Sequence, residues 1–235
     1  GTWSVATDLS KAIAVKEGLE KAVGGNARIL YAKGSPFEAD NELEKRGTMF
    51  GRELKKDDRT PAELLNEALQ VASQSDVIVA TLGEASEMSG ESSSRTNIEI
   101  PQVQKDLLAA LLKTGKPVVL VLFTGRPLAL SWEQKNVPAI LNVWFGGSEA
   151  GNAIADVLFG DVNPSGKLTT SFPQNIGQVP IFYAHKNTGR PLAKGKWFEK
   201  FRSNYLDVSN DPLYPFGFGL SYTSFGYSNI KLSST

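Results

Sequence analysis

The stretch 117-PVVLVLF-123 decides the fold class of this chain. Every residue in it is apolar, which is typical of a strand buried on both faces of a parallel sheet. The preceding residues, Gln102–Thr114, carry apolar side chains at helical spacing and are followed by Gly115, a helix stop. The same alternation of strand and helix continues in both directions along the chain. It predicts an α/β fold in which a mostly parallel sheet is flanked by helices on both faces.

The other predicted elements extend this pattern. Further strands are expected at Arg28–Ala32, Asp76–Leu82 and Ala139–Phe145, with an edge strand at Lys167–Phe172. Further helices are expected at Asp8–Val23 (stopped by Gly24), near 41–46, from Thr60 through Ala72, and at Glu149–Phe159. Thr60, Pro61 and Glu63 form a capping-box start, and Ser148 is expected to cap the last helix. From Pro173 onward the pattern ends, and we expect an irregular tail, rich in aromatic residues, Pro and Gly, packed on the surface.

Composition excludes several classes of function. The chain has 235 residues, zero formal net charge and no cysteine. Its basic residues are scattered, so we expect no nucleic-acid partner and no membrane partner. Without cysteine there is no disulfide framework, thiolate nucleophile or zinc–thiolate site. The first ten residues, GTWSVATDLS, lack the charged and apolar regions of a signal peptide.

The loop Leu82–Pro101 is the predicted location of the chemistry. It follows one predicted strand and precedes a predicted helix, and it contains Glu84, Glu87, Glu91 and Arg95. In open α/β sheets, ligands bind outside the carboxyl ends of the strands. A long loop at such a position is usually functional.

The motifs narrow the chemistry of this loop. There is no glycine-rich phosphate loop of either common type, so nucleotide binding is disfavoured. There is no G-x-S-x-G elbow, and His185 is the only histidine, so a serine triad is disfavoured. The glutamates do not have the spacing of an EF-hand, and we expect no metal and no cofactor. Acid–base work by carboxylates remains, as in glycoside cleavage, although any single glutamate here could equally be a solvated loop residue.

Several segments resemble family 3 glycoside hydrolases. Gly90–Arg95, Ile100-Pro101 and Gln104 resemble the acid/base loop of that family. The downstream segments that also agree are 116–122, 125–127, 150–160, 163–168 and 214–222. Their order and spacing are most similar to bacterial periplasmic β-glucosidases, a likeness that implies a periplasmic or secreted enzyme.

The resemblance implies a domain organisation. Residues 1–222 would form an (α/β)6 sandwich, and residues 223–235 would begin a link to a fibronectin-like domain. A preceding (β/α)8 barrel would bind the glucosyl unit and carry the nucleophilic aspartate. The chain would then supply half of a split active site and be inactive alone. The surface that faces the barrel would be apolar, and in isolation it would favour a homodimer.

The resemblance also assigns roles to residues. Glu91 matches the general acid/base, and Arg95 matches an arginine expected to brace the loop or pair with a neighbouring carboxylate. Glu87 is a fallback and supporting residue, whereas Glu84 is expected to anchor the loop. The residues expected to contact substrate are Ser89, Ser92 and His185.

The resemblance leaves alternatives open for both the substrate and the role of this chain. The implied substrates are β-glucosides or cello- and gluco-oligosaccharides. Many relatives carry Gly-Tyr-Asp-Arg after the glutamate, whereas this loop has Ser92-Ser93-Ser94-Arg95, so β-xylosidase and exo-glucanase readings stay open. A non-catalytic carbohydrate-binding or interaction module of the same fold is the alternative from another class. A flavodoxin-like regulator is weaker, because the chain lacks an acidic phosphoacceptor cluster.

Overall fold

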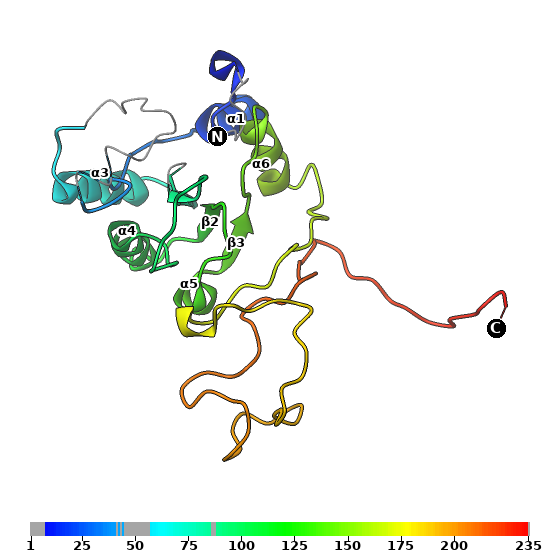
Figure 1. Ribbon diagram of the computed structural model, residues 1–235. Coiled ribbons are helices and arrows are strands. Elements are labelled where there is room, and N and C mark those ends of the chain that lie inside the picture. The colour runs from blue at the N-terminus through cyan, green and yellow to red at the C-terminus, as the bar shows by residue number, and fades with distance from the viewer. Residues whose placement is uncertain (1–7, 41, 43, 45–56, 86–87, 235) are drawn as a thin grey trace.

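A parallel three-stranded sheet forms the centre of the described structure. The computed structural model describes residues 8–40, 42, 44, 57–85 and 88–234 (Figure 1). The strands are β1 (Ile78–Gly83), β2 (Val118–Phe123) and β3 (Ala139–Asn142), in the order β1-β2-β3. Ile78 pairs with Val118, and the register continues to the carboxyl ends of β1 and β2. These two ends therefore lie side by side.

Helices cover both faces of this sheet (Figure 1). On one face are α3 (Pro61–Ser73) and α4 (Gln102–Leu112), and on the other are α1 (Val15–Val23) and α6 (Ala150–Phe159). Strand residues alternate between two cores: Leu120 and Leu122 face α3 and α4, whereas Val121 faces α6. All three of these side chains are fully buried. The predicted α/β class, with helices on both faces of a parallel sheet, is confirmed.

Local signals placed most element ends correctly. Thr60 and Glu63 form the predicted reciprocal capping box at the start of α3, with Pro61 as its first residue. Gly24 ends α1 in the left-handed conformation at φ 53°. A short helix that was not predicted, α5 (Ser131–Asn136), lies between β2 and β3.

Five predictions for individual elements were wrong. Arg28–Ala32 is extended but belongs to no strand, and Lys167–Phe172 contributes only an isolated antiparallel bridge from Phe172 to Tyr214. The helix predicted from Asp8 is interrupted, since a 3-10 turn at Leu9–Lys11 precedes α1. The third strand stops at Asn142, because Trp144 has a positive φ of 49°. Ser148 caps nothing, because the N-cap of α6 is Glu149, without a side-chain hydrogen bond. Of the helix expected near 41–46, the structure describes Glu42 and Glu44, which are both helical, and the other residues lie outside the described ranges.

The interruption before α1 has a packing cause. Ile13 donates its backbone N–H to the Ser148 carbonyl at 2.8 Å and accepts from the Gly151 N–H at 3.1 Å. These contacts fasten the chain to the start of α6. A Cβ on Gly18 would lie 2.1 Å from the Gly151 carbonyl oxygen, so two glycines let α1 and α6 touch backbone to backbone.

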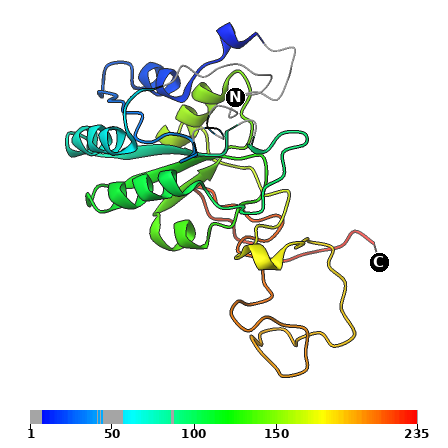
Figure 2. The same ribbon diagram turned by 60° about the vertical axis from the view of Figure 1, so that its left-hand side comes forward.

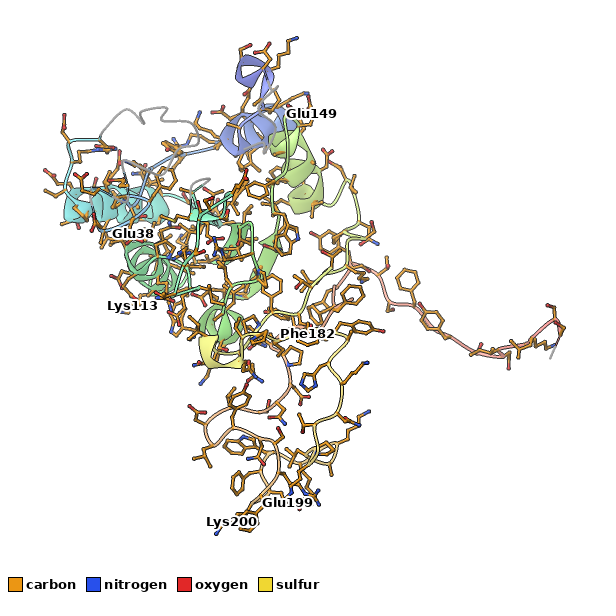
Figure 3. The ribbon with its side chains drawn as sticks, in the orientation of Figure 1. Glu38, Lys113, Glu149, Phe182, Glu199 and Lys200 are labelled. Carbon is orange, nitrogen blue, oxygen red and sulfur yellow. The ribbon has the colours of Figure 1, made fainter. Side chains whose placement is uncertain are left out.

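The tail is irregular, as predicted, but only part of it packs on the body. The ring of Phe172 lies 5.7 Å from that of Trp144 and 6.1 Å from that of Tyr214, which joins the tail to the core. A short 3-10 turn, η4 (Ile176–Gln178), follows. Beyond it, a loop spanning 180–212 projects away from the sheet and helices (Figure 2). Figure 3 places Glu199 and Lys200 at the far end of that loop.

Candidate active site

Glu91 lies on a turn in the long loop that follows β1. The Ser93 N–H donates to the Gly90 carbonyl at 3.1 Å, which closes the turn around Glu91. Ser92 has φ 62°, a left-handed conformation that is uncommon outside glycine. The Glu91 side chain is exposed, and it forms no hydrogen bond or ion pair with any residue that the structure describes. This carboxylate is therefore open to a ligand or to a partner domain.

Glu84 anchors the base of the same loop. Its side chain is 0% exposed, and it forms ion pairs at 2.9 Å with both Arg95 and Arg126. Its other oxygen accepts from the Thr124 hydroxyl at 2.8 Å and from the Gly125 N–H at 3.3 Å. A buried carboxylate with this many donors is well compensated for its loss of water. Arg95 therefore pairs with a neighbouring carboxylate, Glu84, at the end of β1.

Arg126 reaches from the end of β2 to the turn that carries Glu91. Its Nη2 donates to the Ser93 carbonyl at 3.0 Å and also to the Met88 carbonyl. Arg95 acts further along the loop, where its Nη2 donates to the Glu99 carbonyl at 3.2 Å. Two arginines on one buried carboxylate therefore hold different parts of the loop backbone.

Gln104 fixes the strand end beneath this cluster. Its buried amide accepts from the Gly83 N–H at 2.8 Å and donates to the Gly83 carbonyl at 2.9 Å. The same nitrogen donates to the Phe37 carbonyl at 2.9 Å. Gly83 itself has φ 136°, and a Cβ there would lie 1.8 Å from the Phe123 carbonyl oxygen. The peptide just before Glu84 is thus held by α4 and by β2 together.

Ser89 packs against the turn after β2. A Cβ on Gly125 would lie 2.5 Å from the Ser89 hydroxyl and 2.9 Å from the Phe145 ring. The absence of a side chain at Gly125 therefore allows the loop to approach the sheet edge. The carboxyl ends of all three strands contribute to this region, which is the location expected for a ligand site in such a sheet.

The remaining predicted site residues do not all gather here. Ser92 is exposed beside Glu91. His185 lies in the projecting loop, where it lines a hollow formed by residues of the segment 171–216. Nothing in the described contacts brings His185 to the Glu84 cluster. Glu87 lies outside the described residues. Thr124 and Arg126 were not predicted, although the Gly125-Arg126-Pro127 segment was part of the family resemblance.

Glu133 is a separate buried carboxyl. It is 1% exposed, and neither of its oxygens has a hydrogen-bond partner among the described residues. Burial raises the pKa of Glu133 above its ordinary value. Burial, with a smaller effect of Glu133, also raises the pKa of Tyr214. Glu133 also lies within the electrostatic influence of Lys105 and of Glu99 in the Leu82–Pro101 loop.

The described residues contain neither a cluster typical of a metal site nor a helix able to cross a membrane. No group of three or more His, Cys, Asp or Glu residues has the arrangement of a metal site there. No helix in the described ranges is both long and apolar enough to cross a membrane. The arrangement at the sheet edge is therefore one free carboxylate on a turn that is braced by buried charges. Such a carboxylate is suited to giving and taking a proton.

Comparison with known proteins identifies the family. The family model described as "Glycosyl hydrolase family 3 C-terminal domain" matches residues 1–222. A periplasmic beta-glucosidase of Salmonella typhimurium is 52% identical over 234 residues, which are 100% of this chain and 30% of that protein. A beta-xylosidase of Formosa agariphila is 40% identical over 223 residues, or 95% of this chain and 27% of that protein.

A solved structure agrees with these relatives. The beta-glucosidase of Listeria innocua in complex with isofagomine superposes with a TM-score of 0.77 at 35% identity. The match covers 95% of this chain and 28% of the Listeria chain. This chain therefore spans less than a third of the relatives named here. The fold, the matched residues and the relatives agree: the chain belongs to glycosyl hydrolase family 3, as a C-terminal domain.

Proposed function

We propose that this chain supplies the general acid/base, Glu91, to a retaining β-glucosidase that hydrolyses terminal β-D-glucosyl residues. The observation that carries the proposal is the contrast at the sheet edge. Glu91 has an exposed carboxylate without a partner among the described residues, whereas the backbone around it is held by Arg126. A fixed backbone with a free carboxylate is what a proton donor needs.

The nucleophile is proposed to come from outside this chain. A retaining mechanism needs a second carboxyl group about 5–5.5 Å from the first. Of the nearby carboxylates in the described ranges, Glu84 is enclosed by its arginines and Glu99 pairs with Lys105 at 2.9 Å. Glu84 is therefore not free to attack a sugar. We propose that an aspartate on a (β/α)8 barrel is the nucleophile, and that residues 1–222 form the domain that docks on that barrel.

Exposed aromatic side chains in the tail support a missing partner domain. Tyr183 is 76% exposed, Phe201 is 73% exposed and Tyr227 is 89% exposed. Rings exposed to this degree along an irregular segment suit burial against another domain of the same enzyme. We propose a periplasmic location from the Salmonella relative, which is named as a periplasmic enzyme. The proposed substrates are β-glucosides and short gluco-oligosaccharides.

A chimeric enzyme tests the proposal. In it, this chain replaces the matching 234 residues of the Salmonella typhimurium enzyme. We expect the chain alone to be inactive and the chimera to hydrolyse aryl β-glucosides. Glu91→Gln should lower kcat/KM on a poorly activated glucoside by about 10²–10⁴-fold, the usual contribution of an acid/base group. Glu17→Gln, which changes an exposed glutamate on α1, is the matched control and should leave the rate unchanged.

The same experiment addresses a non-catalytic role. An active chimera whose rate is unaffected by Glu91→Gln would contradict the assignment and favour a binding or interaction module. A second enzymatic candidate is the equivalent domain of a β-xylosidase, favoured by the 40% identity to the Formosa agariphila relative. Side-by-side assays of the full-length enzyme with 4-nitrophenyl β-glucoside and β-xyloside separate the two.

A further inference from the structure

Arg126 joins the sheet edge to both sides of the turn on which Glu91 stands. It comes three residues after the end of β2. Its Nη2 donates to the Met88 carbonyl and, at 3.0 Å, to the Ser93 carbonyl. Met88 lies before Glu91 in the chain and Ser93 after it. One nitrogen atom therefore bridges the turn from behind, while the Glu91 carboxylate stays exposed.

The guanidinium of Arg126 is itself held in place. Its Nε lies 2.9 Å from a Glu84 oxygen, and the arginine side chain is only 21% exposed. Glu84 is in turn fixed by the Thr124 hydroxyl and by the Gly125 N–H, both at the end of β2. Nε forms this ion pair without the geometry of a hydrogen bond, so the guanidinium is held beside Glu84 by charge and by the two hydrogen bonds that its Nη2 donates. The restraint on the turn therefore originates in the sheet.

We propose that Arg126 is a positioning residue for Glu91, an inference that rests on the proposed acid/base role. A proton donor must reach the glycosidic oxygen at about 2.6–3.2 Å. A displacement of about 1 Å can cost about 10²-fold in rate. Without Arg126, the Met88 and Ser93 carbonyls lose their common donor. The left-handed Ser92 between them then has one restraint fewer against relaxing.

Arg95 has a different part in the same cluster. It belongs to the loop itself, pairs with Glu84 and donates to the Glu99 carbonyl. These contacts secure the later part of the loop, between Arg95 and α4. Among the hydrogen bonds of the described residues, those of Arg126 join the segment after β2 to the 88–93 turn, where Ser89 also packs against Gly125. The two arginines share one carboxylate and have separable effects.

The test compares two leaving groups in the chimeric enzyme. The 4-methoxyphenolate of an aryl β-glucoside needs protonation as it departs, whereas 2,4-dinitrophenolate is stable enough to depart without it. We expect Arg126→Met to lower kcat/KM for 4-methoxyphenyl β-glucoside by about 10²-fold. For 2,4-dinitrophenyl β-glucoside the loss should stay below about tenfold. The ratio of the two values, which a general loss of folded enzyme does not change, is the readout.

A matched control and a conservative variant sharpen the comparison. Arg59 lies just before the N-cap of α3 and forms ion pairs at 2.6 Å with both Asp57 and Glu67, and Arg59→Met should leave the ratio unchanged. Arg126→Lys keeps a positive charge near Glu84 but not the planar donor set. It should recover only part of the ratio that Arg126→Met loses. If the loss of charge were the whole cause, Arg126→Lys would recover the ratio in full.

The outcomes distinguish this inference from the proposed function. The positioning role is wrong if Glu91→Gln changes the ratio but folded Arg126→Met and Arg126→Lys lower kcat/KM equally for both substrates. If all the Arg126 variants show the same ratio as the parent chimera, the positioning role is also wrong. If Glu91→Gln itself leaves the ratio unchanged, the proposed function fails first. Should Arg126→Met not fold by circular dichroism, the ratio in Arg126→Lys decides.

Discussion

Removing the Glu84 carboxylate should destabilise this domain more than any change to a surface ion pair. In Glu84→Ala, the two arginines lose the anion that compensates them, while remaining only 17% and 21% exposed. Removing one partner of a buried pair typically costs about 3–5 kcal/mol. Both guanidinium groups retain some contact with water, so we expect the lower end, about 3 kcal/mol in the free energy of unfolding.

The structure also gives the size of the thermal effect and a control. For a domain of this length, about 3 kcal/mol corresponds to a decrease of about 6–12 °C in Tm. Urea unfolding followed by circular dichroism measures the free energy, and a thermal scan measures Tm. Glu67→Ala removes the ion pair between Arg59 and Glu67, whose side chains are 42% and 41% exposed, and it should change the free energy of unfolding far less.

A small effect of Glu84→Ala would refute this reasoning. If the loss is below about 1 kcal/mol, Glu84 behaves like a surface residue, and the cluster is not holding the loop. Glu84→Gln adds a second reading. It keeps the shape and the acceptor for Thr124 but removes the charge, so its cost should lie between those of the parent and Glu84→Ala.

Three further changes test other parts of the structure. Glu133→Gln should raise the free energy of unfolding more at pH 8 than near pH 4 in urea titrations, because burial raises the pKa of the Glu133 carboxyl in the folded state and its ionisation above the unfolded pKa costs stability. Equal effects at both pH values would contradict this. Gln104→Leu should lower the free energy of unfolding by about 2–4 kcal/mol, since it leaves the backbone N–H and carbonyl of Gly83 without their side-chain partner. A loss well under 1 kcal/mol would show that these two groups find other partners. Gly18→Ala should lower Tm by driving a methyl group into the Gly151 backbone of α6, at a cost of about 1–3 kcal/mol, whereas Gly166→Ala, which meets nothing within 4 Å and has no left-handed backbone, controls for the loss of a glycine.

The sequence predicted those parts of the fold that depend on neighbouring residues. The apolar run at 117–123, the Thr60 capping box and the Gly24 stop each depend on local chemistry, and all three appear in the structure. Arg28–Ala32 failed because strand formation needs a partner, and the sheet of the described residues ends at β1 on that side. Helix formation from Asp8 failed because residues near Ile13 bond to the start of α6 instead, a contact between distant segments.

The candidate site was predictable in part. The loop after β1 followed from strand ends and loop length, and its glutamate and arginine followed from the family resemblance. Arg126 was missed because its partners are backbone carbonyls in another segment, which leave no pattern of side chains to read. A signal was present, however. Gly125 and Arg126 directly follow a buried strand whose carboxyl end lies beside that of β1, and a cation there is well placed to act on the neighbouring loop.

Rescue by azide is the most direct test of Glu91 as acid/base on a split active site. In the chimera carrying Glu91→Ala, 2,4-dinitrophenyl β-glucoside should still transfer its glucosyl group to the nucleophile, but water should then attack slowly for lack of a general base. Azide needs no deprotonation, so it should displace the enzyme carboxylate at the anomeric carbon, raise kcat and yield β-glucosyl azide. Unchanged turnover without azide, or no β-glucosyl azide in its presence, would contradict the account.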